Sequence, residues 1–171
     1  DYFKASNPLW NASQNSRDKG SNLLLSNYFM AEYFPTTEWR VRARLGLTYG
    51  NDDTEKFYSR NDTRYENVET TKKGEFHSNN VRTNQVEAEL SVTYAKVLGK
   101  HRINLVAGGN ISSNKSLTQG YSAVGFPDGD FSYPSFSNGY PEYGTPAYYE
   151  SVSRSVNGYF NAGYSFDDRY L

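Results

Sequence analysis

Apolar and polar residues alternate along several stretches of the chain, most clearly in WRVRARLGLTYG, residues 39–50. Every odd position there is large or apolar, and every even position is polar or glycine. Since side chains alternate across a strand with a period of two, the stretch predicts a strand with one apolar and one polar face. It exceeds the roughly five or six residues typical of a soluble strand. It reaches the roughly nine to eleven residues with which a tilted strand crosses a bilayer.

The same alternation predicts further strands along the chain. The expected strands cover residues 22–33, 39–50, 84–95, 101–113 and 152–165, with the start of another at residue 170.

The predicted connections alternate between short and long. Short turns follow residues 33, 95 and 165, whereas two long excursions span 51–83 and 114–151. Aromatic residues gather beside the short turns, among them Tyr33, Trp39, Tyr94 and Tyr164. Short turns at one end, long loops at the other and an aromatic girdle are typical of outer-membrane barrels. We therefore expect an all-β fold of antiparallel up-and-down strands forming part of a transmembrane β-barrel.

Composition agrees with strands joined by turns. The 171 residues include sixteen tyrosines and ten phenylalanines, no cysteine, and a formal net charge of −1. Near-neutral charge argues against nucleic acid as a partner. The first residues, DYFKASNPLW, lack the charged and apolar regions of a signal peptide, and a further strand is expected to start near residue 170. We therefore expect an internal piece of a longer protein.

Several segments also resemble a known family. These are NPLWNA, AEYFPTTEWRVRARLGLTYG, YAKVLGKHRINLVAGGN, SAVGFP and RSVNGYFNAGYSFDDRYL. They are similar, in order, to the barrel region of SusC/RagA-type TonB-dependent transporters. The resemblance implies one segment, residues 1–171, of the wall of a barrel of about 22 strands in the outer membrane of a Gram-negative bacterium.

What the family does is implied by the same resemblance. Such importers take up oligosaccharides or peptides beneath a SusD/RagB-type surface lipoprotein. The plug and the TonB contact would belong to an N-terminal region outside these 171 residues. Outer-membrane lipid would contact the apolar face, and no enzymatic activity is expected.

The second excursion is the richest candidate for a binding site. Aromatic faces stack on sugar rings or peptide side chains, and tyrosine gives contact area at low entropic cost. We expect these rings to contact substrate or the lipoprotein, or to pack on one another and order the loop. They are Tyr121, Phe126, Phe131, Tyr133, Phe136, Tyr140, Tyr143, Tyr148 and Tyr149.

The arginines of the first strand are the second candidate. Arg40, Arg42 and Arg44 share the polar face, so they should face the lumen and the plug if the apolar face meets lipid. Acidic groups of the plug would pair with them, or they form a merely solvated face.

No cofactor is expected. Asp128 and Asp130 offer carboxylates to a calcium ion, but no twelve-residue loop with a closing glutamate follows. His77 and His101 stand alone, without the spacing of metal ligands.

One alternative of another class stays open: a soluble β-sandwich binding module with an aromatic recognition loop. A sandwich would bury the apolar face against a second sheet, whereas a barrel segment presents it to lipid.

Overall fold

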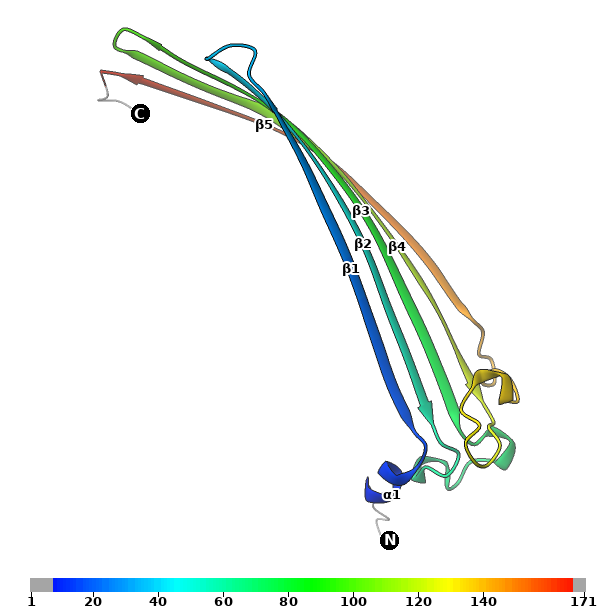
Figure 1. Cartoon of the computed structure of the whole chain (residues 1–171). Coiled ribbons are helices and arrows are strands. Elements are labelled where there is room, and N and C mark those ends of the chain that lie inside the picture. The colour runs from blue at the N-terminus through cyan, green and yellow to red at the C-terminus, as the bar shows by residue number, and fades with distance from the viewer. Residues whose placement is uncertain (1–7, 168–171) are drawn as a thin grey trace, which may run out of the picture. The chain divides into compact units, whose positions relative to one another are not determined.

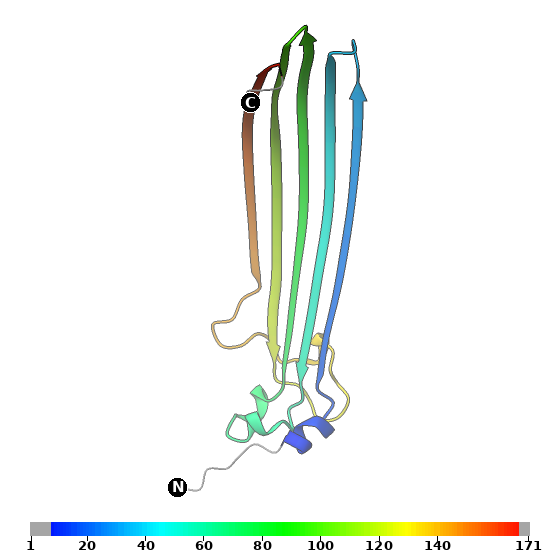
Figure 2. The ribbon, with the colours of Figure 1, turned by 90° about the vertical axis from the view of Figure 1, so that its left-hand side faces the viewer.

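The computed structural model describes residues 8–167, which form one five-stranded sheet. The strands are ordered β1-β2-β3-β4-β5, so each pairs with its neighbour in the chain and runs antiparallel to it (Figures 1 and 2). The prediction of an all-β, antiparallel up-and-down fold is confirmed. The strands are β1 (Arg17–Tyr33), β2 (Trp39–Tyr58), β3 (Glu75–Leu98), β4 (His101–Val124) and β5 (Ala147–Phe166).

The remaining elements are short. A helix, α1, covers Pro8–Ser13 and precedes the first strand. Three single-turn 3₁₀ helices lie in the long connections: Thr63–Tyr65, Thr70–Lys72 and Pro134–Phe136. Among the described residues, no helix is long and apolar enough to cross a membrane.

The strands extend further into the polar segments than the alternation predicts. The expected strand 101–113 continues to Val124, 39–50 continues to Tyr58, and 84–95 begins already at Glu75. Backbone pairing needs no apolar side chain, so a ladder continues where the alternation of polarity stops. The long connections shrink accordingly to 59–74 and 125–146. The strand start expected at residue 170 lies outside the described residues.

The chain divides into two compact units. The loop unit holds the residues up to Leu23, Gly50–Arg82 and Leu117–Glu150. The strand unit holds Leu24–Tyr49, Thr83–Ser116 and the residues from Ser151 onward. Both long connections belong to the loop unit, and the turns that join β1 to β2 and β3 to β4 belong to the strand unit.

The loop unit has a small aromatic core. Phe57, Phe76, Ala123 and Phe126 are each only 2% exposed, and Tyr121 packs against them. The rings of Phe57 and Phe126 meet edge to face, with centroids 5.0 Å apart. Phe126 comes from the second long connection, so its burial ties that connection to β2 and β3.

The strand unit has no such core among its described residues. Its large apolar side chains lie at the surface, with Leu90 55%, Ile111 56% and Val156 79% exposed. A sheet that exposes one continuous apolar face needs something other than its own chain to cover that face.

Candidate functional site

The apolar face of the strand unit forms a shallow hollow of about 580 Å³. All five strands contribute to it, because alternate residues of each strand point to this side. Its apolar lining includes Phe29, Ala31, Ala43, Leu45, Ala88, Leu90, Ile111 and Val156. We call this set the apolar face.

The opposite side of the strand unit carries polar side chains that pair across the strands. Glu89 lies 3.6 Å from the Arg44 guanidinium and accepts a hydrogen bond from the Tyr159 hydroxyl at 3.0 Å. Arg42 donates to the Glu32 carboxylate at 2.7 Å. Opposite charges on facing strands stabilise a sheet modestly. We call this side the polar face.

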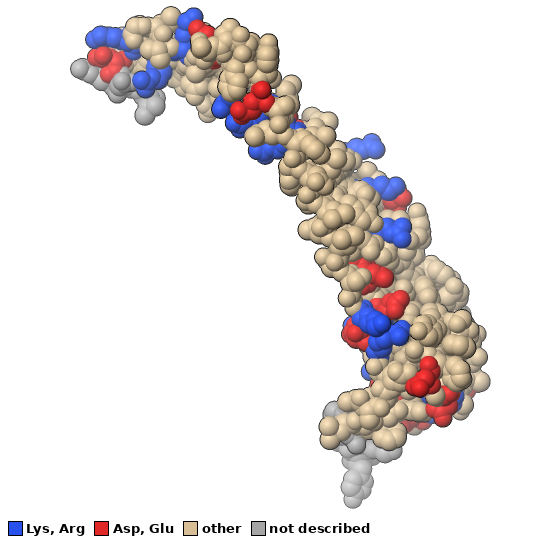
Figure 3. Space-filling model, viewed as in Figure 1, with Lys and Arg blue, Asp and Glu red and all other residues tan. Residues whose placement is uncertain are grey.

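Charges are therefore mixed rather than segregated. In Figure 3 acidic and basic side chains lie next to one another in several places. Of the three arginines expected to face a lumen, Arg42 and Arg44 are paired within the sheet, and Arg40 is exposed on the same side of β2.

Two tyrosines lie over glycines on the polar face. A side chain at Gly46 would place its Cβ 2.9 Å from the ring of Tyr28, and one at Gly108 would lie 2.6 Å from the Tyr159 ring. Both contacts are closer than a Cβ tolerates, so each glycine leaves room for a ring. Glycine in a strand interior often marks such a close approach.

Aromatic residues flank the turns of the strand unit. Trp39 and Tyr94 have ring centroids 4.7 Å apart, and His101 lies 5.0 Å from Phe166 and shares a 2.7 Å hydrogen bond with the Tyr164 hydroxyl. Rings with one apolar body and one polar tip are enriched at membrane interfaces.

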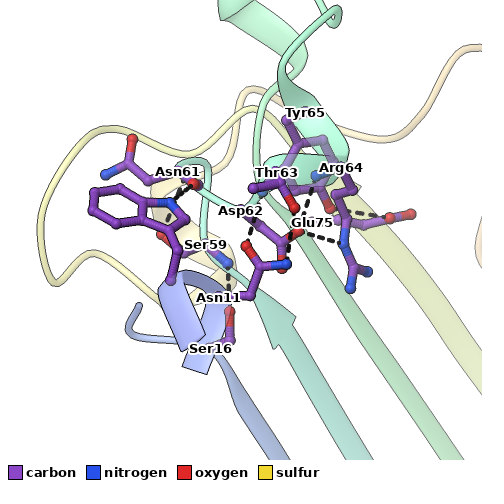
Figure 4. A network of polar contacts seen from close by, with 10 residues as sticks. Asn11, Ser16, Ser59, Asn61, Asp62, Thr63, Arg64, Tyr65 and Glu75 are labelled. Atoms are coloured by element: carbon purple, nitrogen blue, oxygen red, sulfur yellow. Dashed lines mark hydrogen bonds and ion pairs between the residues drawn. The ribbon is translucent and has the colours of Figure 1, made fainter. Parts of the chain in front are cut away.

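In the loop unit, α1 is held against the turn that follows β2 (Figure 4). The Trp10 indole N–H donates to the Asn61 carbonyl at 2.9 Å. Asn11 and Thr63 bond reciprocally: the Asn11 amide donates to the Thr63 hydroxyl at 2.9 Å and accepts from the Thr63 N–H at 3.0 Å. Residues 1–21 look like loop in the sequence, so neither the helix nor this contact was predicted.

The carboxylates of Asp128 and Asp130, weighed above as calcium ligands, accept hydrogen bonds within the loop unit. Asp128 accepts hydrogen bonds from the Asn61 amide at 2.9 Å and from the Gly129 N–H at 3.1 Å. These bonds lower the pKa of the Asp128 carboxyl below its usual range. Asp130 accepts from the Asn15 amide at 3.2 Å. Among residues 8–167, no cluster of three or more His, Asp or Glu side chains is arranged to hold a metal ion.

The nine aromatic residues predicted as a binding loop fall into different environments. Phe126 is buried in the core, and half-buried Tyr121 packs between Phe76 and Tyr140. Burial raises the pKa of the Tyr121 hydroxyl. The exposed members are Phe131, Tyr133, Phe136, Tyr140, Tyr143, Tyr148 and Tyr149.

A polar cluster surrounds His77, and it was not predicted from the sequence. Its Nδ1 lies 2.7 Å from the Ser122 hydroxyl and its Nε2 lies 3.1 Å from Glu75. Glu75 also accepts a long, 3.5 Å hydrogen bond from Tyr65, whose pKa is raised by burial and by the nearby Glu75 charge. The spacing Glu75-x-His77 on β3 was the only hint of the cluster in the sequence. Ser122 reaches His77 only because β3 and β4 pair in the sheet.

The Glu75–His77–Ser122 order is that of a hydrolase triad, but its setting is a regular sheet. The N–H groups of a strand are paired in ladders, and acyl transfer also needs donors aimed at a developing oxyanion. We therefore assign the cluster a structural role.

Two comparisons with known proteins found nothing: no protein-family model and no curated protein matches the sequence. Solved structures do match. A chain in the structure of the RagAB peptide transporter aligns with a TM-score of 0.76 and 15% identity, covering 90% of this chain. A chain of the RagAB peptide importer in the "closed-closed" state aligns with a TM-score of 0.71 and 16% identity, covering 91%.

The alignment covers only part of those proteins. This chain spans 17% of the length of each transporter chain that it matches. At such low identity the likeness establishes the fold: the sheet has the fold of a segment of a transporter chain.

Proposed function

We propose that the chain is part of the wall of an outer-membrane β-barrel importer of the SusC/RagA kind. The observation that carries the proposal is the contrast between the two sides of the strand unit. One side exposes apolar residues from all five strands, and the other carries cross-strand polar pairs.

This contrast fits a wall between lipid and water. Soluble monomers rarely expose a contiguous apolar patch beyond about 300–600 Å². Lipid keeps the apolar side chains of such a face out of water, and a water-filled lumen suits the paired charges of the other face. The outer edges of β1 and β5 have no partner in the described sheet, and further strands of the whole protein would pair with them.

The transported solute and the partners form the finer part of the proposal. The likeness to a peptide transporter and the family resemblance support import of peptides or oligosaccharides with a SusD/RagB-type lipoprotein and TonB. The soluble β-sandwich is less well supported, because residues 8–167 form a single sheet and its apolar face is uncovered.

Cysteine labelling in intact cells tests the proposal. The 171 residues contain no cysteine. In the full-length protein, with any other cysteine replaced, Thr71→Cys probes the loop unit and Leu98→Cys probes the end of β3, next to a turn of the strand unit. A membrane-impermeant maleimide should label Cys at 71 in intact cells and Cys at 98 only after permeabilisation.

Recovery of the protein in a soluble fraction would contradict the proposal. Equal labelling of both positions in intact cells would contradict it too, because the two turns would then lie on one side of the membrane.

A further inference from the structure

A tight turn in the loop unit carries one tyrosine into solvent. The turn is 141–144, closed by the Gly144 N–H, which donates to the Pro141 carbonyl at 2.7 Å. Its third residue, Tyr143, has a φ of 61° and is 97% exposed. Within residues 8–167, Asp167 is the only other non-glycine residue with a positive φ.

Tyrosine is an unfavourable residue at this position. A turn with a positive φ only at its third residue follows the type II pattern, which prefers glycine or asparagine there. A bulky side chain in the left-handed region is strained, and such strain is concentrated at binding and active sites. Local folding would favour another residue, so the ring's contribution is to something outside the chain's own packing.

The surrounding contacts hold the turn in place. Glu142 lies 3.4 Å from the Lys72 ammonium. The Asn138 amide donates to the Thr71 carbonyl at 2.7 Å, and the Val124 N–H donates to the Gly139 carbonyl at 2.9 Å. Tyr143 is thus presented from a preorganised turn, which lowers the entropy lost when a partner binds.

The exposure of the ring indicates what kind of partner it fits. Tyr140 packs against Tyr121, with ring centroids 6.5 Å apart, and is 53% exposed. Its ring is therefore supported from one side and free on the other, where a ligand could stack on it. Tyr143 has nothing behind its ring. A sugar would cover one face only, whereas a pocket in a protein would cover both.

We infer that Tyr143 is an anchor that inserts into an apolar pocket on a partner protein. Aromatic residues buried in this way are the usual hot spots of interfaces. A fully covered aromatic side chain buries about 150–250 Å², so several partly exposed rings supply much of the roughly 800 Å² per partner of a standard interface. The other exposed rings of the same connection, residues 125–146, are Phe131, Tyr133, Phe136 and Tyr140.

The inference rests on the proposed function, under which the SusD/RagB-type lipoprotein is the partner to test. The dissociation constant of the purified lipoprotein is measured against the full-length protein in detergent. Tyr143→Ala should weaken binding by at least about 30-fold, the size of a hot-spot effect. Tyr143→Phe should stay within about threefold, because it keeps the ring.

Tyr143→Gly separates the ring from the turn. Glycine accepts the positive φ, so hydrogen exchange at the Gly144 amide should be unchanged or slower while binding falls as much as in the alanine variant. Tyr33→Ala is the matched control and should leave binding unchanged: Tyr33 is 67% exposed but lies at the end of β1, in the strand unit.

Unaltered binding by Tyr143→Ala would overturn the inference and leave the proposed function standing. A Tyr143→Ala variant that keeps its affinity for the lipoprotein but no longer binds the transported solute would also overturn the inference, because the ring would then belong to a solute-binding site. Absence of binding by the unmodified protein would contradict both the partner and this inference.

Discussion

The two units of the chain use their aromatic and apolar residues in opposite ways. The loop unit buries Phe57, Phe76 and Phe126 in a core of its own, and polar contacts hold α1 to it. The strand unit leaves Leu90, Ile111 and Val156 uncovered and pairs its charges on the other side of the sheet. The loop unit buries its rings as a domain in water does, whereas the described residues of the strand unit leave an apolar face uncovered.

Truncating the core of the loop unit should have the largest effect. Phe126→Ala removes its largest fully buried side chain and should destabilise the unit by about 3–5 kcal/mol. Hydrogen exchange of the full-length protein should accelerate in 57–76 and 121–143, with 24–49 unchanged. Phe131→Ala, in which a 45% exposed ring is lost, is the control and should change exchange little. Acceleration in both units would contradict the separation of the two.

A charge on the apolar face should be nearly as costly in the strand unit. Leu90→Arg should destabilise the assembled protein by about 2–4 kcal/mol, the cost of an arginine facing the middle of a bilayer. The amount recovered folded from the outer membrane measures this. Ser91→Arg, one residue along β3 on the polar face, is the control. Equal recovery of the two variants would show that lipid does not cover Leu90.

Removing the hydrogen bonds between α1 and the turn that follows β2 should have a smaller effect. Asn11→Ala removes two hydrogen bonds to Thr63 and should cost about 1–2 kcal/mol, read from exchange of the Thr63 and Tyr65 amides. Asn15→Ala loses only an exposed bond to Asp130 and should cost less. If Asn15→Ala proved the more harmful variant, the segment between α1 and β1 would hold this part of the chain instead of Asn11.

The smallest effect concerns pH. The pKa of Tyr65 is raised in the folded unit, so the unfolded unit releases this proton at lower pH than the folded one. The stability of the loop unit should be unaffected below about pH 9 and fall above about pH 10. Tyr65→Phe should flatten that decline while costing little at pH 7, because its bond to Glu75 is long at 3.5 Å. An identical decline in the variant would assign it to another group.

The sequence predicted the strand unit better than the loop unit, and the reason is physical. Alternation of polarity is strong where one face meets an apolar phase, so 39–50 and 84–95 were recognisable as strands. In the polar segments the same strands continue through backbone pairing alone, and the pattern that would mark them is missing.

The sequence did not predict the environment of each aromatic residue in the second long connection. Phe126 and Tyr143 both stand among glycines and prolines, yet one is 2% and the other 97% exposed. Their difference comes from contacts with segments far along the chain, such as Phe57 for the first ring and Lys72 for the turn of the second. The contact of α1 with Thr63 likewise depends on tertiary packing rather than on local pattern.

Under the proposed function the apolar face meets lipid, and the accessibility of successive residues along β3 measures this. Single spin labels at Glu89, Leu90, Ser91 and Val92 of the full-length protein in bilayers would be exposed in turn to oxygen and to a water-soluble nickel chelate. Lipid on the apolar face should give oxygen access at 90 and 92, nickel access at 89 and 91, and a period of two. Nickel access at 90 and 92, or low access of both reagents there, would contradict it, because water or protein would then cover the apolar face.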